Sequence, residues 1–237
     1  MANRGIFVTG TGTGVGKTVV AASIIAALTA QGRRVSAFKP AVSGIDEPAT
    51  EWPADHELLA GATGWQAPEC VTPLLFGPAV SPHLAAEQAG VGIELPALVA
   101  AFEAAAAEAD VIVAEGVGGL LVPLSESPPL DVLDFAKAID LPVVVATHPG
   151  LGTISDTRLT VDRLRAEGMT VAAVVISGWP ADPDAMQLSN RETLARLCAT
   201  EVATLPVPTP DGLVDAAEGL PIDRSPPVAR RVAGVYP

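Results

Sequence analysis

The stretch Ile6-Phe-Val-Thr-Gly-Thr-Gly-Thr-Gly-Val-Gly-Lys-Thr18 decides the fold of this chain. Its first three residues are apolar and predict a buried strand, and an apolar helical pattern, Val19–Ala30, follows its last residue. A strand, a glycine-rich loop, Gly-Lys-Thr and a helix, in that order, are typical of a loop that binds the phosphates of a nucleotide. The glycines let backbone amides converge on an anion, Lys17 adds a full positive charge, and the Thr18 hydroxyl is suited to ligate Mg²⁺. We therefore expect the chain to bind a nucleoside triphosphate.

The rest of the chain alternates between apolar runs and helical patterns. The runs that predict buried strands are Val35–Phe38, Val111–Ala114, Pro142–Ala146, Val171–Ile176 and Val202–Pro206. The helical patterns that separate them are His56–Ala62, Leu95–Ala109, Leu130–Ile139, Thr153–Glu167 and Asp184–Ala199. This alternation predicts one α/β domain over residues 1–237, with a doubly wound, largely parallel sheet of the P-loop NTPase type. We expect a long irregular connection over residues 63–82 and a poorly ordered tail over residues 221–237.

Composition narrows the class of protein. The 237 residues carry a formal net charge of −13, which argues against binding nucleic acid or an acidic membrane surface. Neither a signal peptide nor an apolar run long enough for a membrane span is visible, and the two cysteines lack the spacing of a zinc site. We therefore expect a cytoplasmic protein whose partners are small molecules, with no nucleic acid and no membrane among them.

Polar residues at the ends of the predicted strands are candidates for chemistry, because ligands of such a sheet bind at the carboxyl ends of its strands. Glu115 closes one strand and could hold Mg²⁺ opposite Thr18; the alternative is a glutamate that accepts bonds from nearby backbone. Asp55 lies at a helix start, so it is either a second carboxylate for the metal or an ordinary helix cap. Lys39 ends another strand and is a candidate for binding an anion; the alternative is a lysine that reaches solvent at the sheet edge.

Together these residues resemble the dethiobiotin synthetases. The matching segments are Val8–Thr18, Lys39-Pro-Ala-Val-Ser-Gly44, Asp55, Ser81-Pro-His83, Glu115-Gly-Val-Gly-Gly119 and Leu151-Gly-Thr-Ile154, in the order and spacing of that family. The resemblance covers roughly residues 5–210, and its most specific part is the long phosphate loop followed by the Lys-Pro-x-x-Ser-Gly segment. It implies a ligase of biotin biosynthesis that carboxylates 7,8-diaminopelargonic acid with CO₂ and closes the ring of dethiobiotin. The implied route runs through a carbamate and a carbamic–phosphoric anhydride and releases ADP and phosphate.

The resemblance also implies a role for each residue of the site. Catalysis is expected of Thr13, Lys17 and Lys39. The residues expected to bind ATP are Gly14, Val15, Gly16, Lys17, Thr18, Val19, Glu115, Ser177, Gly178 and Pro206, and those expected to bind Mg²⁺ are Thr18, Asp55 and Glu115. The residues expected to bind diaminopelargonate are Thr13, Lys39, Ser43, Gly118, Gly119, Gly152, Thr153, Ile154 and Ser155. In the family, the segment that matches Gly152–Ser155 comes from the partner subunit of a homodimer and binds the distant carboxylate of the substrate.

Three positions depart from the family's pattern. Gly12-Thr13-Gly14 stands where many members have Asp-Thr-Glu, and Ser155 stands where an Asn is usual. Ser177-Gly178 stands where an Asn usually contacts the adenine. Loss of an amide that can both donate and accept predicts weaker ATP binding or tolerance of other nucleotides, and it leaves the preferred base open. We expect no catalytic role for His83 or His148, and we expect His83 to shape the substrate pocket.

Two other classes of protein share parts of this pattern. A nucleotide-switch ATPase of the chromosome-partition or septum-positioning kind has the same sheet topology, but its loop carries a second lysine near the start. This chain has no lysine in the loop before Lys17. A synthetase domain of the cobyrinate amidotransferase kind works with a nucleophilic cysteine, and neither Cys70 nor Cys198 lies in such a context. The switch ATPase therefore remains the main alternative to the synthetase.

Overall fold

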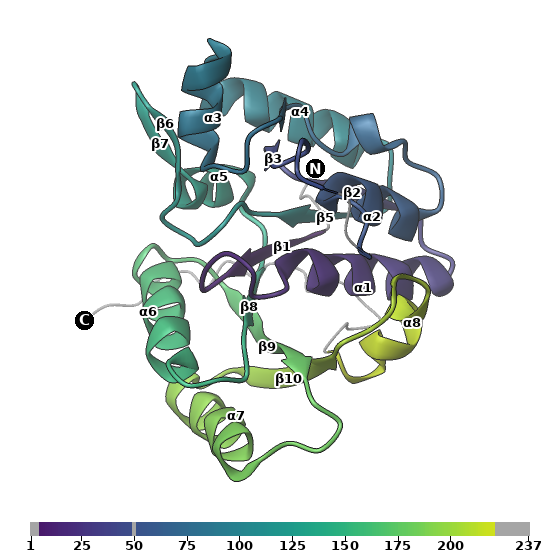
Figure 1. The fold of residues 1–237 in the computed structure, drawn as a ribbon, viewed down its shortest axis with the longest axis vertical. Coiled ribbons are helices and arrows are strands. Elements are labelled where there is room, and N and C mark those ends of the chain that lie inside the picture. Colours follow the sequence, from purple (N-terminus) through teal and green to yellow (C-terminus); the bar gives the residue numbers. More distant parts are fainter. Residues whose placement is uncertain (1–4, 49–50, 221–237) are drawn as a thin grey trace, which may run out of the picture.

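A six-stranded parallel sheet forms the centre of the computed structural model, which describes residues 5–48 and 51–220 (Figure 1). Its strands are β1 (Gly5–Gly10), β2 (Val35–Phe38), β5 (Val111–Glu115), β8 (Val143–Thr147), β9 (Val171–Trp179) and β10 (Glu201–Pro206). They lie in the order β10-β9-β8-β1-β5-β2, and every adjacent pair is parallel. The prediction of a parallel sheet from doubly apolar runs is therefore confirmed.

Helices cover both faces of this sheet (Figure 1). The helices on one face are α1 (Lys17–Ala30), α2 (Asp55–Thr63) and α8 (Leu213–Ala216). Those on the other face are α4 (Leu95–Ala107), α5 (Val132–Ile139), α6 (Thr153–Ala166) and α7 (Ala185–Cys198). Successive side chains of a strand point to opposite faces, so Phe7 and Val8 of β1 join different cores. The sheet is doubly wound, as predicted.

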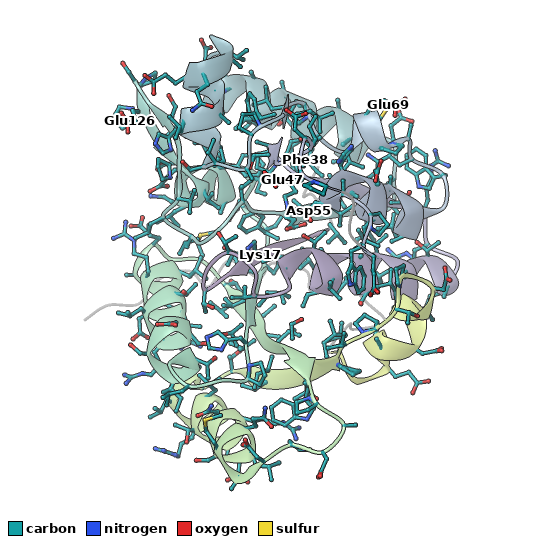
Figure 2. The ribbon with its side chains drawn as sticks, viewed as in Figure 1. Lys17, Phe38, Glu47, Asp55, Glu69 and Glu126 are labelled. Carbon is teal, nitrogen blue, oxygen red and sulfur yellow. The ribbon has the colours of Figure 1, made fainter. Side chains whose placement is uncertain are left out.

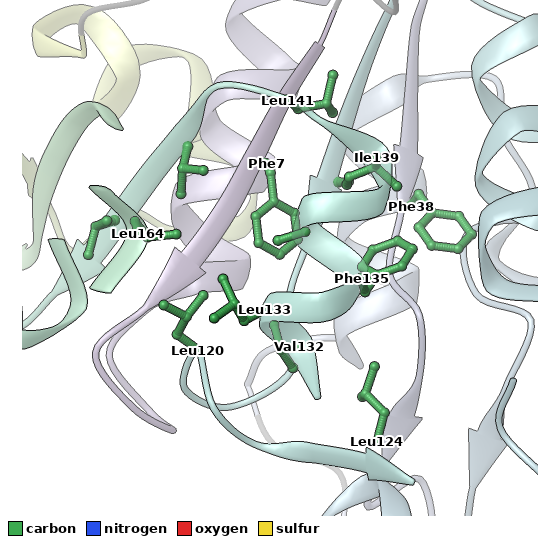
Figure 3. Close-up of a cluster of buried hydrophobic side chains, with 14 of the residues drawn as sticks. Phe7, Phe38, Leu120, Leu124, Val132, Leu133, Phe135, Ile139, Leu141 and Leu164 are labelled. Carbon is green, nitrogen blue, oxygen red and sulfur yellow. The ribbon is translucent and has the colours of Figure 1, made fainter. Parts of the chain in front are cut away.

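Four phenylalanines from different elements form the centre of one core. Phe7 of β1, Phe38 of β2, Phe102 of α4 and Phe135 of α5 have ring centroids 5.7 to 6.4 Å apart, and three of the four contacts are edge-on. Such pairs stabilise a core beyond the area that they bury. Figure 3 shows Phe38 and Phe135 close together, with Phe7 in the same cluster. Because Phe38 is fixed on this side, the next residue, Lys39, is held at the carboxyl edge of the sheet.

Several short elements were not predicted from the sequence. The two-residue strands β3 (Val42–Ser43) and β4 (Leu75–Phe76) pair in parallel, and β6 (Pro123–Glu126) and β7 (Pro129–Asp131) form an antiparallel ribbon. The remaining elements are α3 (Pro82–Ala89), η1 (Pro68–Cys70), η2 (Pro210–Gly212) and η3 (Ala217–Gly219). The prediction that a helix begins at Leu130 is wrong, because Leu130 lies in β7. Asp131 caps α5 instead, and its Oδ1 accepts from the Asp134 amide at 2.9 Å.

Two further sequence expectations bear on the described residues. None of the helices in this part of the chain has the length and apolar character that crossing a membrane requires. Both cysteines are free, Cys70 at the surface and Cys198 in the core. The tail 221–237, expected to be poorly ordered, lies outside the described residues.

Candidate active site

The strand order brings the predicted site residues together. β5 lies between β1 and β2, so the phosphate loop, Glu115 and Lys39 all leave the sheet at one edge. They line a cavity of about 640 Å³. Of the predicted residues, those that line it are Thr13, Gly14, Gly16, Lys17, Thr18, Val19, Lys39, Ser43, Asp55, Glu115 and Gly118. Figure 2 shows two of them, Lys17 and Asp55, near each other at the centre of the molecule.

The phosphate loop is shaped by glycines with left-handed backbone. Gly14 has φ 76° and Gly16 has φ 84°, conformations that side chains with a Cβ rarely adopt. Gly16 is also the N-cap of α1, and no side chain caps that helix. The amides at its positive end therefore stay available for an anion. A methyl group on Gly16 would overlap Ser177 Oγ, so the loop also packs closely against the end of β9.

Lys17 bends back over its own loop. Its Nζ donates to the Gly12 carbonyl oxygen at 2.7 Å. Burial lowers the pKa of Lys17 to about 8, a shift that Glu115 opposes. A phosphate group in the cavity would favour the charged form of Lys17 and raise this pKa again.

Lys39 sits in a charge cluster with Asp55 and Glu115, in which Lys39 and Glu115 are buried. Its Nζ donates to Asp55 Oδ2 at 2.5 Å and to Glu115 Oε1 at 2.7 Å, and Thr18 Oγ1 donates to the same Glu115 oxygen at 2.9 Å. Only 3% of Lys39 is exposed, which rules out a lysine that reaches solvent at the sheet edge. Burial lowers the pKa of Lys39, but the charges of Glu115 and Asp55 outweigh that effect and raise it.

The two carboxylates of the cluster differ. Burial raises the pKa of Asp55, but the attraction of the Lys39 ammonium is stronger than this effect and lowers the pKa below its usual value. Glu115 is fully buried, and this burial raises the pKa of its carboxyl against the attraction of Lys39. Both carboxylates are held by side chains of the site. This contact with Thr18 and Lys39 favours the site interpretation of Glu115, and Ala54, not Asp55, is the N-cap of α2.

The oxygens of this cluster fit a hard divalent cation. Glu115 Oε2 is buried and accepts no hydrogen bond from any residue that the structure describes. Together with Thr18 Oγ1 and the Asp55 carboxylate it offers the type of oxygen ligand that Mg²⁺ prefers. Within residues 5–48 and 51–220, no group of three or more His, Cys, Asp and Glu side chains is gathered for a metal. The candidate set therefore consists of two carboxylates and one hydroxyl.

The other predicted residues do not line the cavity. The Val15 side chain packs near Gly10, Gly119 faces the backbone of Gly12, and Ser177 packs against Gly16. Gly178 and Pro206 lie at the ends of β9 and β10, two strands and more from β1. The segment Gly152–Ser155 opens α6, with Gly152 as its N-cap at φ 96° and no side chain in a capping bond.

Most of the apolar wall of the cavity was not predicted from the sequence. The lining residues without a predicted role are Ala41, Val42, Trp52, Pro53, Leu58, Ala79, Val80, Ser81, Pro82, Val117 and Val122. Ala41, Val42, Ser81, Pro82 and Val117 belong to the matching segments but were given no role. The others have no signal beyond closeness in sequence to a motif residue, as Trp52 is close to Asp55. His83, which was expected to shape the pocket, is not among the lining residues. Its Nε2 lies 3.5 Å from Glu126 Oε1 instead.

Comparison with known proteins decides between the candidate classes. A family model described as an AAA domain matches residues 4–210. The ATP-dependent dethiobiotin synthetase BioD of Anaeromyxobacter dehalogenans (strain 2CP-C) is 40% identical over 205 residues, 86% of this chain and 90% of that protein. The chain belongs to the dethiobiotin synthetase family. The BioD of Mycobacterium sp. (strain KMS) is a further member, 36% identical over 208 residues, which are 84% of this chain and 86% of that protein.

Solved structures share the fold of this dethiobiotin synthetase family member. The MinC:MinD cell division complex of Aquifex aeolicus has a TM-score of 0.54 at 14% identity, over 90% of this chain and 94% of that one. The cell division ATPase MinD of Pyrococcus furiosus has a TM-score of 0.52 at 19% identity, over 87% and 84% of the two chains. At such identities the likeness shows the P-loop sheet and nothing of activity. The sequence relatives therefore favour the synthetase over the switch ATPase.

Proposed function

We propose that this chain catalyses the ATP-dependent closure of a cyclic urea, from 7,8-diaminopelargonic acid and CO₂ to dethiobiotin, ADP and phosphate. Membership of the dethiobiotin synthetase family carries this proposal. The cavity supports it, because a phosphate loop and a buried lysine face the same space. An enzyme that must hold a γ-phosphate and a second anion side by side needs such a pair.

The reaction needs little covalent help from the protein. One amine of the substrate adds to CO₂ and loses a proton, which gives a carbamate. A carbamate oxygen then attacks the γ-phosphorus, and the bond from that phosphorus to ADP breaks. The second amine attacks the carbonyl carbon of the resulting anhydride, loses a proton and expels phosphate, which closes the ring. Positioning and charge stabilisation therefore account for most of the catalysis.

The charged residues divide these tasks. Lys17 and the amides at the start of α1 are suited to the γ-phosphate, whose charge grows during transfer. Lys39 is suited to the carbamate, with the Thr13 and Ser43 side chains on the same cavity wall. Thr18, Asp55 and Glu115 would hold Mg²⁺. When bound, the ion would neutralise negative charge on the phosphates.

The substrate carboxylate needs a second anion site, and we place it at the start of α6 in a partner subunit. An uncapped helix N-terminus is suited to a carboxylate. Gly152–Ser155 do not line the cavity of their own chain, which supports a site completed by a second copy. Leu151, just before α6, is 87% exposed, and Leu159, on α6, is 69% exposed. These leucines offer apolar surface for such a homodimer.

Mixing two inactive variants tests the shared site. Lys39→Ala removes the anion group of one chain, and Gly152→Val strains the left-handed N-cap of α6. If α6 serves the partner, a mixed dimer has one intact site, and an equal mixture regains about a quarter of wild-type activity. A mixture as inactive as its parents would contradict the shared site. Ser155→Glu, an exposed change that adds negative charge, replaces Gly152→Val if that variant does not fold.

The activity itself is tested by incubation with ATP, Mg²⁺, bicarbonate and diaminopelargonate, followed by mass spectrometry for dethiobiotin. Lys39→Ala should abolish product, whereas Lys137→Ala, at an exposed lysine paired with Glu167, should not. A Lys39→Ala variant within a few-fold of wild type would overturn the role of Lys39. Absence of product together with lipid-stimulated ATP hydrolysis would favour the switch ATPase. The reaction consumes ATP, so we place the enzyme in the cytoplasm.

A further inference from the structure

Four threonine hydroxyls meet behind the phosphate loop. Thr147, the last residue of β8, has its Oγ1 2.8 Å from that of Thr153, 3.2 Å from that of Thr11 and 3.0 Å from that of Thr157, which donates to it. Thr147, Thr153 and Thr157 are fully buried, and Thr11 is half-buried in the loop. The cluster thus joins three elements: the phosphate loop, the end of β8, and the first two turns of α6.

The Thr157 hydroxyl donates to Thr147 instead of to a backbone carbonyl of its own helix. A threonine inside a helix commonly donates to the carbonyl four residues earlier, as Thr160 does to Asp156 O at 2.9 Å. Thr157 lies on the same helix but donates to Thr147 across the gap between helix and strand. The residues before Thr147 in β8 are Val143–Ala146, so a valine at position 147 would suit the strand equally well. The hydroxyl of Thr147, not its bulk, is what connects these elements.

Thr147 can satisfy all three contacts at once. A threonine hydroxyl has one hydrogen and accepts two bonds. The Thr147 hydroxyl accepts a hydrogen bond from Thr157. It donates its own hydrogen to either Thr11 or Thr153, and the other of these two threonines then donates to Thr147. In either arrangement the start of α6 stays tied to the phosphate loop. Loss of the Thr147 hydroxyl would leave the buried hydroxyls of Thr153 and Thr157 without this hydrogen-bond partner, which is costly in an apolar interior.

The start of α6 depends on this inner contact. It follows two glycines, Gly150 and the left-handed Gly152. On its outer side, Asn190 of α7 donates to the carbonyls of Pro149 and Gly150 at 2.9 and 3.3 Å and so holds the turn that precedes the helix. Thr147 holds the helix itself, through its first residue, Thr153.

We propose that Thr147 is a positioning residue, whose hydroxyl fixes the first turn of α6 against the phosphate loop and thereby sets the affinity for the substrate carboxylate. The proposal rests on the function proposed above, in which that turn binds the carboxylate. The loop has other supports, among them the bond from the Thr11 amide to Ala146 O at 3.0 Å. Loss of the hydroxyl should therefore affect the amine substrate more than ATP.

Three variants test this role. Thr147→Val keeps the shape and removes the hydroxyl, and Thr147→Ser keeps the hydroxyl. Thr160→Val is the matched control, because it removes another buried hydroxyl of α6 that lies outside the cluster. We expect Thr147→Val to raise KM for diaminopelargonate about tenfold, with KM for ATP and kcat within twofold, and we expect Thr147→Ser and Thr160→Val to stay near wild type.

Hydrogen exchange gives a readout that needs no activity. In Thr147→Val, amides of the first turn of α6 should exchange at least about tenfold faster than in wild type, and those of β1 should not. Faster exchange with the expected split in KM supports the proposal. Unchanged KM for diaminopelargonate in an active variant, or equal changes in KM for both substrates, overturns it. If Thr147→Val does not fold, Thr147→Ala replaces it, because it removes the same hydroxyl, and the same split in KM is expected. Failure of the wild-type protein to make dethiobiotin would refute the proposed function, whatever the exchange rates are.

Discussion

Replacing Lys39 by methionine would remove one charge from the charge cluster and keep most of the side-chain volume. Asp55 and Glu115 would lose the ammonium group that now donates to both. Most of the lost stability should come from Glu115, which is fully buried and would be left unpaired. Asp55 contributes less, because its side chain is 45% exposed and is screened by water. Breaking a buried pair costs about 3–5 kcal/mol, so we expect a loss of unfolding free energy near the lower end, about 3 kcal/mol at pH 8.

The loss should depend on pH through Glu115. Burial already raises the pKa of this carboxyl, and removal of Lys39 takes away the attraction that opposes the shift. A carboxyl whose pKa is higher in the folded than in the unfolded protein does not destabilise the fold below its unfolded pKa, about 4.3. It destabilises the fold fully only above its folded pKa. In wild type, the lowered pKa of Asp55 contributes stability above its unfolded pKa that is lost as pH falls. Both effects make the difference between the two proteins grow from pH 4 toward pH 8.

Urea titrations at pH 5 and pH 8, followed by circular dichroism, measure this difference. With a slope of about 2 kcal/mol per molar urea, a loss of 3 kcal/mol lowers the midpoint by about 1.5 M. Lys137→Met is the matched control, since Lys137 pairs with Glu167 at the surface, and its midpoint should change little. A Lys39→Met midpoint equal to wild type at pH 8, or the same loss at both pH values, would refute the reasoning.

Three further predictions concern the nucleotide. Gly16→Ala should abolish nucleotide binding and lower the free energy of unfolding by about 2 kcal/mol in urea titrations, because its methyl group overlaps Ser177 at a left-handed position. Gly32→Ala, at a left-handed position in open space, should cost only about 1 kcal/mol in the same titrations. Burial lowers the pKa of Lys17 to about 8, so ATP affinity should fall about tenfold per pH unit above that value, with proton uptake in calorimetry; a constant affinity from pH 7 to 10 would contradict this. Because Ser177-Gly178 lacks an amide side chain, kcat/KM for other nucleoside triphosphates should lie within about tenfold of that for ATP, and strict ATP selectivity in such a panel would disprove it.

The sheet and the charged half of the site are predictable because their signals are local. Val111–Ala114 is apolar at every position, and Val35–Phe38 is apolar except at Ser36; runs of this kind are typical of strands buried on both faces. Lys39 and Glu115 stand at the ends of two such runs. Their meeting at one edge follows from the rule that parallel strands present their carboxyl ends together.

The parts that were missed depend on contacts between distant segments. β6 and β7 are short and begin with prolines, so they give no alternating pattern that predicts a ribbon. The apolar wall of the cavity includes Trp52 and Val122, which only the folded chain brings together. The same holds for the threonine cluster, because Thr11 and Thr147 are 136 residues apart and share no motif.

The central place of β1 also has a consequence for synthesis of the protein. Ile6 pairs with Val113 and Val8 with Val144, so the first strand made is among the last to find both of its partners. At about 5–20 residues per second, the ribosome needs about 7 to 27 seconds to advance from Val8 to its pairing partner Val144. During that interval an apolar strand and its glycine loop are without their sheet, which makes them a target for chaperones. A nonsense codon between the end of α1 and β8 would yield a fragment that carries the phosphate loop and lacks β8, β9 and β10 of the sheet.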